Sequence, residues 1–99
     1  MRLTPEALDE LANAVRRVAP DVKTIRLFGS RLDDSARGGD VDLMVEFDHA
    51  IDHPAVLAAR LAVHASRAIG GRAVDVVLKA PNLQESSIHR VALETGVAI

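Results

Sequence analysis

The sequence contains no cysteine, tyrosine or tryptophan, and its only aromatic rings belong to Phe28 and Phe47. Without cysteine, the chain can form no disulfide framework, thiolate zinc site or cysteine nucleophile. Proteins that bind single-stranded nucleic acids stack bases on exposed aromatic side chains, and this chain offers almost none. The formal net charge of −2 also lacks the basic excess that is typical of a nucleic-acid-binding surface. We therefore expect no direct nucleic-acid partner.

Long apolar runs are absent as well. No run approaches the ~20 residues that a bilayer span requires, and the N-terminus lacks a signal-peptide pattern. We therefore expect a cytoplasmic protein with no membrane partner. Apolar residues still make up 48% of the 99 residues, which predicts a folded chain with a modest core, organised as a single domain over residues 1–99.

Helix and strand signals alternate along the chain. Thr4 is a suitable N-cap, Pro5 suits the first helical position, and Pro20 ends the first helix. The remaining expected elements are strands at 22–28, 40–47 and 72–79, a short helical turn at 31–34, helices at 54–70 and 83–95, and a packed tail at 97–99. This αβ(α)βαβα order predicts an α+β fold, in which helices flank a small mixed β-sheet of three or more strands.

Apolar spacing also predicts which helix faces are buried. In the second helix the expected inward stripe is Val56, Leu57, Leu61, His64, Ala65, Ala68 and Ile69. In the last helix it is Leu83, Ile88, Val91, Ala92 and Leu93. We expect His89, on the same helix, to lie in solvent or at an interface.

Two aspartates begin the second predicted strand. Side chains alternate between the faces of a strand, so Asp40 and Asp42 lie on one face, with alpha carbons ~7 Å apart. Val41, Leu43 and Val45 then point into the core. An isolated Asp-X-Asp is often a turn cap or a solvated strand edge. Paired carboxylates repel each other, however, and Mg²⁺ bound together with substrate phosphates is a natural compensation.

A third aspartate strengthens the metal interpretation. Asp75 lies in the strand Val74-Asp75-Val76-Val77-Leu78, which we expect to be buried on at least one face, where an unpaired carboxylate is costly. Glu46 lies on the same strand face as Asp42, at the rim of this site or as a solvated strand end. A zinc site at His49 and His53 is disfavoured, because these residues lie in a loop without secured helical spacing.

A Gly-Ser turn follows the first strand and supplies the phosphate end of the same site. Backbone N–H groups at the tip of a strand that turns into a helical segment can bind anions. Gly29 allows close approach of a phosphate, Ser30 adds a hydroxyl donor, and Arg31 and Arg37 flank the turn. Alone, such a turn with two solvated arginines means little, and its value comes from the aspartates that follow.

Together these segments resemble the nucleotidyltransferase superfamily that includes DNA polymerase beta, and specifically its minimal nucleotidyltransferase (MNT) branch. The matching stretches are Leu27-Phe28-Gly29-Ser30-Arg31, Gly39-Asp40-Val41-Asp42-Leu43 and Val74-Asp75-Val76-Val77. The order of elements matches over the whole chain, so a palm-like nucleotidyltransferase fold is expected. Nine residues separate Ser30 from Asp40, one fewer than in many members. The resemblance therefore leaves open whether Arg31, Ser35 or Arg37 contacts phosphate.

The resemblance implies a metal-dependent transfer reaction. Asp40, Asp42 and Asp75 would be the catalytic carboxylates and would hold two Mg²⁺ ions, while Gly29, Ser30, Arg31 and Arg37 would bind the nucleoside triphosphate. ATP is the donor that the family favours. Members of this size are commonly paired with a helical HEPN-domain protein or a related substrate-binding partner.

Three functions remain open at this point. The first is transfer of AMP to a hydroxyl of a HEPN-type toxin, for which the chain would be the antitoxin. Since the chain has no tyrosine, a tyrosine acceptor would have to lie on another molecule. The second is a non-catalytic subunit that neutralises a partner RNase by contact, and the third is transfer to a small molecule.

Overall fold

The computed structural model describes residues 3–29 and 41–99, and within these ranges it contains three helices and four strands. In chain order these are α1 (Pro5–Val18), β1 (Thr24–Phe28), β2 (Val41–Glu46), α2 (Pro54–Ala68), β3 (Val74–Lys79), α3 (Ser87–Thr95) and β4 (Val97–Ala98). The predicted α+β class and the order of elements are confirmed. The helical turn expected at 31–34 lies outside the described residues.

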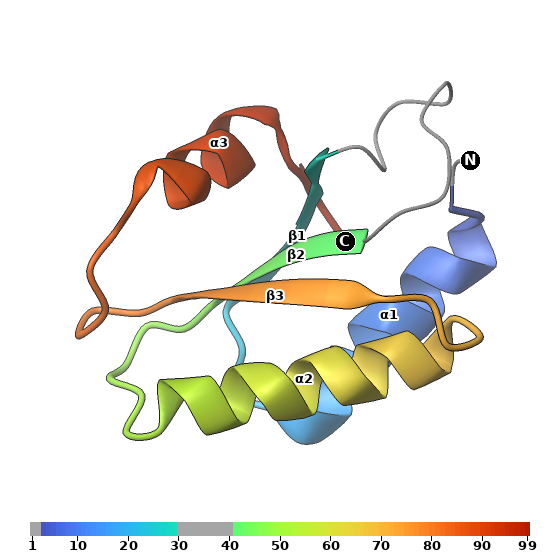
Figure 1. Cartoon of the computed structure of the whole chain (residues 1–99), viewed down its shortest axis with the longest axis horizontal. Helices are drawn as coiled ribbons and strands as arrows, with labels where there is room; N and C mark the ends of the chain where they lie inside the picture. The colour runs from blue at the N-terminus through green and yellow to red at the C-terminus, as the bar shows by residue number, and fades with distance from the viewer. Residues whose placement is uncertain (1–2, 30–40) are drawn as a thin grey trace.

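The strands form one mixed sheet in the order β3-β2-β1-β4. β1 pairs antiparallel with both β2 and β4, whereas β2 and β3 are parallel. Helix α2 makes the crossover between these parallel strands (Figure 1). The tail that we expected to pack without regular structure instead adds a fourth strand, because residues Val97 and Ala98 pair with Leu27 and Arg26.

The two faces of the sheet are covered unequally. Helices α1 and α2 lie side by side against one face, and α3 lies over the other (Figure 1). The larger core is on the side of α1 and α2, where Leu11, Val15, Leu43, Val45 and Leu61 are fully buried. The core under α3 is small: Phe28, Met44 and Ala92, with Val77 packed against them. No helix of the described part of the chain is long and apolar enough to cross a membrane.

The ends of the first two helices follow from local sequence. The Ala7 N–H donates to Thr4 Oγ1 at 3.1 Å, and Pro5 occupies the first turn of α1 as predicted. Gly70 and Gly71 follow α2 with φ angles of +76° and +87°, and the Gly71 N–H donates to Ser66 O. Glycine adopts this left-handed backbone without steric cost, which ends the helix.

Helix α3 departs from the prediction in its start and in its buried face. It begins at Ser87 rather than at residue 83, because residues 80–83 form a turn and Ser86 is the N-cap. Its inward residues are His89 and Ala92, whereas Ile88 and Val91 are 42% and 44% exposed. A nine-residue helix contacts the sheet along a narrow face, so apolar residues beside that face stay in solvent.

The stripe predicted for α2 is also only partly correct. Leu61 and Ala65 are buried, and Leu57, Ala68 and Ile69 are partly buried. Val56 and His64 are exposed, because α2 packs on one side against both α1 and the sheet and its outer side faces solvent. Our expectation that these two residues face inward is therefore wrong.

Candidate functional site

Strand alternation divides the polar and apolar residues of the central strands between the two sheet faces. Val41, Leu43 and Val45 belong to the core on the side of α1 and α2, as predicted. Met44 and Val77 pack under α3 on the opposite side. Asp42 precedes Met44 by two residues and Asp75 precedes Val77 by two, so both aspartates lie on the α3 side.

The strand register brings these two aspartates together. Asp42 and Asp75 are partners in the parallel pairing of β2 with β3, and neighbouring strands lie about 4.7–4.9 Å apart. They are therefore adjacent residues on one face, although 32 positions lie between them in the sequence. Two neighbouring carboxylates offer the oxygen donors that Mg²⁺ prefers, so the donor set in this part of the sheet fits a divalent cation.

The environment of Asp75 differs from our expectation. Its neighbours Val74 and Leu78 are buried, but the Asp75 side chain is exposed. β3 is an edge strand, and α3 covers this face only from Val77 onward. Asp75 therefore lies beside the covered part of the sheet and is open to solvent, while Asp42 on the inner strand is partly buried.

Gly29 lies against this pair. It follows β1, whose last residue, Phe28, is the register partner of Asp42. Gly29 has a φ angle of +78°, and a side-chain carbon on it would collide with the Asp42 carboxylate. Glycine is thus required here both by the left-handed backbone and by the close approach of the carboxylate.

The other predicted site residues are not placed by the structure. Ser30, Arg31, Arg37 and Asp40 lie outside the described residues. The pairing of Asp40 with Asp42, and the contacts of the two arginines with phosphate, therefore stay predictions.

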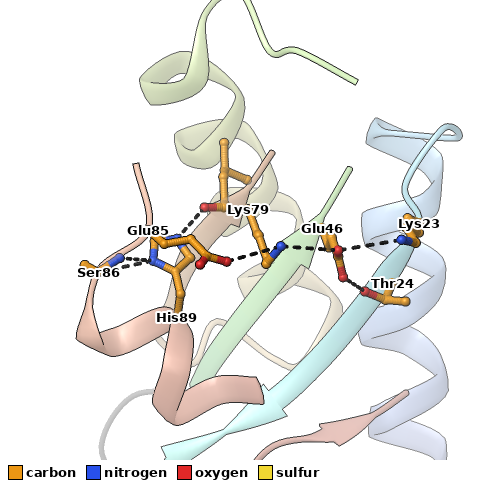
Figure 2. A network of polar contacts seen from close by, with 8 residues as sticks. Lys23, Thr24, Glu46, Lys79, Glu85, Ser86 and His89 are labelled. Atoms are coloured by element: carbon orange, nitrogen blue, oxygen red, sulfur yellow. Dashed lines mark hydrogen bonds and ion pairs between the residues drawn. The ribbon is translucent and has the colours of Figure 1, made fainter. Parts of the chain in front are cut away.

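Glu46 lies on the same face, four residues along β2 from Asp42, or about 13 Å. It is neither at the rim of the Asp42 site nor a freely solvated strand end. Thr24 Oγ1 donates to Glu46 Oε1 at 2.8 Å, and the ammonium groups of Lys79 and Lys23 lie 3.6 and 3.8 Å from Glu46 Oε2 (Figure 2). Lys23, Glu46 and Lys79 border a hollow of about 430 Å³.

The charges of this network shift its pKa values. Burial alone would raise the pKa of Glu46, but the hydrogen bond from Thr24 and the charges of Lys79 and Lys23 outweigh it and lower that pKa. The hydrogen bond from Lys79 to Glu85, at 3.2 Å, raises the pKa of Lys79. The network therefore holds its members in their charged forms.

The histidines do not form a metal centre. His49 donates to Ala50 O at 3.0 Å and pairs with Asp21, and these contacts raise the pKa of His49. Among the residues that the structure describes, no group of three or more potential ligands could hold a metal ion. Asp40, the third predicted carboxylate, is not among the residues searched.

Sequence reasoning missed two residues with structural roles. Asn82 accepts from Ile51 N and donates to Ile51 O, both at 2.9 Å, and so joins the connection after β3 to the loop before α2. His89, which we expected in solvent or at an interface, is 7% exposed and hydrogen-bonded at both ring nitrogens. The Ser86-X-X-His89 spacing of a capping box is the signal in the sequence from which the role of His89 could have been predicted.

Three solved structures of toxin–antitoxin systems have a fold similar to that of this chain. One, solved with AMP-PNP, is 21% identical with a TM-score of 0.69, and the match covers 91% of this chain and 69% of that chain. A variant of the MntA–HpeT pair is 20% identical with a TM-score of 0.66, over 93% and 69% of the two chains. A tri-AMPylated Shewanella oneidensis HEPN toxin in complex with MNT antitoxin is also 20% identical, with a TM-score of 0.65 over 93% and 67%.

These similarities establish that the chain has the MNT fold, as the sequence motifs predicted. No curated protein matches the sequence. The family model of the nucleotidyltransferase domain matches residues 8–99, which is nearly the whole chain. The chain therefore belongs to the nucleotidyltransferase domain family.

Proposed function

We propose that this chain transfers AMP from ATP to a hydroxyl group of a helical, HEPN-type partner protein and acts as the antitoxin of that partner. The observation that carries the proposal is the register pairing of Asp42 with Asp75, with Gly29 against Asp42. Membership of the nucleotidyltransferase family supports the reaction class. The complexes of similar fold contain AMP-PNP in one case and an AMPylated toxin in another, which supports the donor and the acceptor.

Each residue of the site has a distinct role in this proposal. Asp42 and Asp75, together with Asp40, would hold two Mg²⁺ ions, and these ions would supply positive charge against the phosphates of the donor. Gly29 leaves room beside the Asp42 carboxylate. Ser30, Arg31 and Arg37 bind the terminal phosphates and orient the triphosphate for in-line attack.

The transfer exchanges a phosphoanhydride bond of ATP for a phosphoester bond to the acceptor. The acceptor oxygen bonds to the α-phosphorus of ATP, the bond from that phosphorus to the bridging oxygen breaks, and pyrophosphate leaves. The hydroxyl proton goes to Asp75, which is exposed and therefore accessible to a group on another molecule. Because the chain has no tyrosine, a tyrosine acceptor belongs to the partner.

A second candidate is neutralisation of the partner by contact alone. It is favoured by the exposed apolar side chains of Ile88, Val91, Leu93 and Val97 on α3 and β4. Such residues are typical of protein interfaces. This role does not depend on the adjacent carboxylates, so the two candidates predict different behaviour for aspartate variants. Transfer to a small molecule is a third candidate.

The deciding experiment uses α-³²P-ATP, Mg²⁺ and the protein co-purified with its partner from the native host. Asp42→Asn and Asp75→Asn should each reduce labelling of the second polypeptide by roughly 100-fold, because each removes a ligand that positions the reacting groups. Asp52→Asn, at an exposed loop position, is the matched control and should label normally.

Each outcome assigns the function. Label that persists in Asp42→Asn would contradict the site. No label with the natural protein, combined with neutralisation by both natural and variant chains, would establish the contact role. Label recovered only in a small molecule would establish the third candidate.

A further inference from the structure

His89 is the only buried polar side chain within residues 3–29 and 41–99. The proposed transfer reaction does not use it. Its ring lies between the first turn of α3 and β3, and both ring nitrogens have partners (Figure 2). A buried imidazole with two partners holds its surroundings in one arrangement.

The partners of His89 determine its tautomer. The backbone N–H of Ser86 can only donate, and it lies 3.0 Å from His89 Nδ1, so Nδ1 carries no proton. Ser86 Oγ, 3.1 Å from the same nitrogen, donates as well. On the other side, Nε2 lies 2.7 Å from the Leu78 carbonyl oxygen, which can only accept. His89 is therefore neutral, with its proton on Nε2.

The Leu78 carbonyl lies on the open edge of the sheet. The carbonyls of Ala73 and Lys79 accept from β2, and carbonyl direction alternates along a strand. Leu78 O therefore points away from β2, toward the side on which β3 has no neighbouring strand. The imidazole supplies the hydrogen bond that a further strand would otherwise provide.

The remaining contacts of α3 attach it to the middle and the far side of the sheet. Ala92 packs with Phe28 and Met44, next to the Asp42 position. At the helix C-terminus, Arg26 Nη1 donates to Gly96 O at 3.2 Å, and β4 then pairs with β1. Helix α3 thus extends from β3 to β1 on the face that carries both aspartates, and His89 joins its first turn to the strand that carries Asp75.

From this arrangement we propose that neutral His89 is a positioning residue for the transfer reaction. It holds β3 and α3 in a fixed relation, and thereby holds Asp75 beside Asp42. The partners at Nδ1 and Nε2 require one accepting and one donating ring nitrogen, so a side chain that lacks either group breaks the connection between α3 and β3. This inference rests on the proposed function, since positioning is measured through the transfer reaction.

Charged groups near this end of the sheet belong to several elements. Lys79 of β3 is paired with Glu85 of the connection and with Glu46 of β2. The other charged groups on the elements that pack against α3, and on α3 itself, are Asp75, Asp42, Arg26, Arg90 and Glu94. The experiment therefore needs variants that change only the hydrogen bonds of residue 89 and leave these charges in place.

His89→Gln and His89→Leu form that experiment. Glutamine at this position of a capping box accepts from the Ser86 N–H through its oxygen, offers an N–H group to Leu78 O, and does not titrate. Leucine retains volume but makes neither bond. His64→Gln, at an exposed position of α2, is the matched histidine control.

The measurement is AMP transfer from α-³²P-ATP by the co-purified complex at pH 7.5, with circular dichroism to confirm folding. For His89→Leu we expect kcat/KM to fall roughly tenfold, mainly through kcat, because the reacting groups are misplaced. His89→Gln should stay within about twofold of the natural protein, because it restores both hydrogen bonds. His64→Gln should match the natural protein.

Two results would overturn the inference: a folded His89→Leu protein with natural kcat/KM, or a folded His89→Gln protein that loses as much kcat/KM as His89→Leu. Ring ¹⁵N spectra give a reading that needs no activity, and an Nδ1–H tautomer at pH 7.5 would also overturn it. If the natural protein transfers no label, the proposed function fails instead. Hydrogen exchange then tests only whether His89 connects α3 to β3. The α3 amides should exchange about tenfold faster in His89→Leu than in the natural protein, and the α2 amides should be unchanged.

Discussion

At the scale of single residues, the candidate site depends on how closely three small or acidic residues approach one another. Asp42 and Asp75 share a register position, and Gly29 leaves the space that the Asp42 carboxylate occupies. Motif spacing predicted that these residues act together. It did not predict that Asp75 is exposed, because exposure depends on where α3 stops covering the sheet.

The variant Gly29→Ala tests the close contact between Gly29 and the Asp42 carboxylate. The added methyl group should displace the Asp42 carboxylate, so we expect at least a roughly 30-fold loss of AMP transfer from misplacement of the reacting groups. Because alanine is strained in the left-handed backbone conformation, the unfolding free energy should also fall by about 1 kcal/mol. Transfer assays and urea unfolding of the same preparation measure the two effects.

Gly71→Ala separates backbone strain from collision. Gly71 also has a positive φ angle, but nothing lies within 4 Å of an added side-chain carbon there. This variant should lose similar stability, about 1 kcal/mol, and keep natural transfer. Equal loss of transfer in both variants would show that strain alone explains the Gly29 effect.

At the scale of elements, the polar residues under and beside α3 form two groups at opposite ends of one sheet face. Asp42 and Asp75 lie at one end. The network of Glu46 with Lys23 and Lys79, drawn in Figure 2, lies at the other end. The network joins the start of β1 to the ends of β2 and β3 through Thr24, Glu46 and Lys79. It stabilises the sheet through charge rather than through apolar contacts.

Glu46→Gln tests the contribution of that charge. The pKa of Glu46 is lowered in the folded protein from its ordinary value of 4.5. The stabilisation is therefore fully present above about pH 4.5 and is lost as the pH falls through the folded pKa. We expect the variant to be about 1 kcal/mol less stable than the natural protein at pH 7.

Urea unfolding at pH 7 and at pH 3 measures this dependence. The difference in unfolding free energy between the two proteins should narrow at pH 3, where the natural carboxylate takes up a proton. Glu10→Gln, at an exposed position of α1, should show no such narrowing. A difference that stays constant with pH would mean that packing, and not charge, explains the effect.

At the scale of the whole molecule, the larger apolar core and the candidate site lie on opposite faces of the sheet. The face covered by α1 and α2 contains most of the buried apolar residues, whereas the face under α3 contains few and carries the aspartates. Substitutions in the larger core should therefore reduce stability without changing the site directly.

Leu61→Ala and Val63→Ala test this division on one helix. Leu61 is fully buried, so its truncation should cost about 2–5 kcal/mol through lost burial and a cavity. Val63 is 47% exposed, and its truncation should change stability by less than about 0.5 kcal/mol. Thermal unfolding of the two variants gives the comparison, and similar losses would contradict the packing of α2.

The sequence by itself determined the order of elements, the residues that alternate across each strand, and the chemical class of the candidate site. These properties follow from local periodicity, from glycine and proline at the element ends, and from the carboxylate and Gly-Ser spacing. Even so, the narrow buried face of α3 escaped prediction, because apolar Ile88 and Val91 are exposed whereas the polar His89 is buried.

Only the tertiary structure decided which strands are neighbours. That choice places Asp42 beside Asp75, leaves β3 at an edge, and adds Val97 and Ala98 to the sheet. It also buries His89 against the Leu78 carbonyl. Register and edge position arise from contacts between residues far apart in the sequence, and the local preferences of a strand do not specify them.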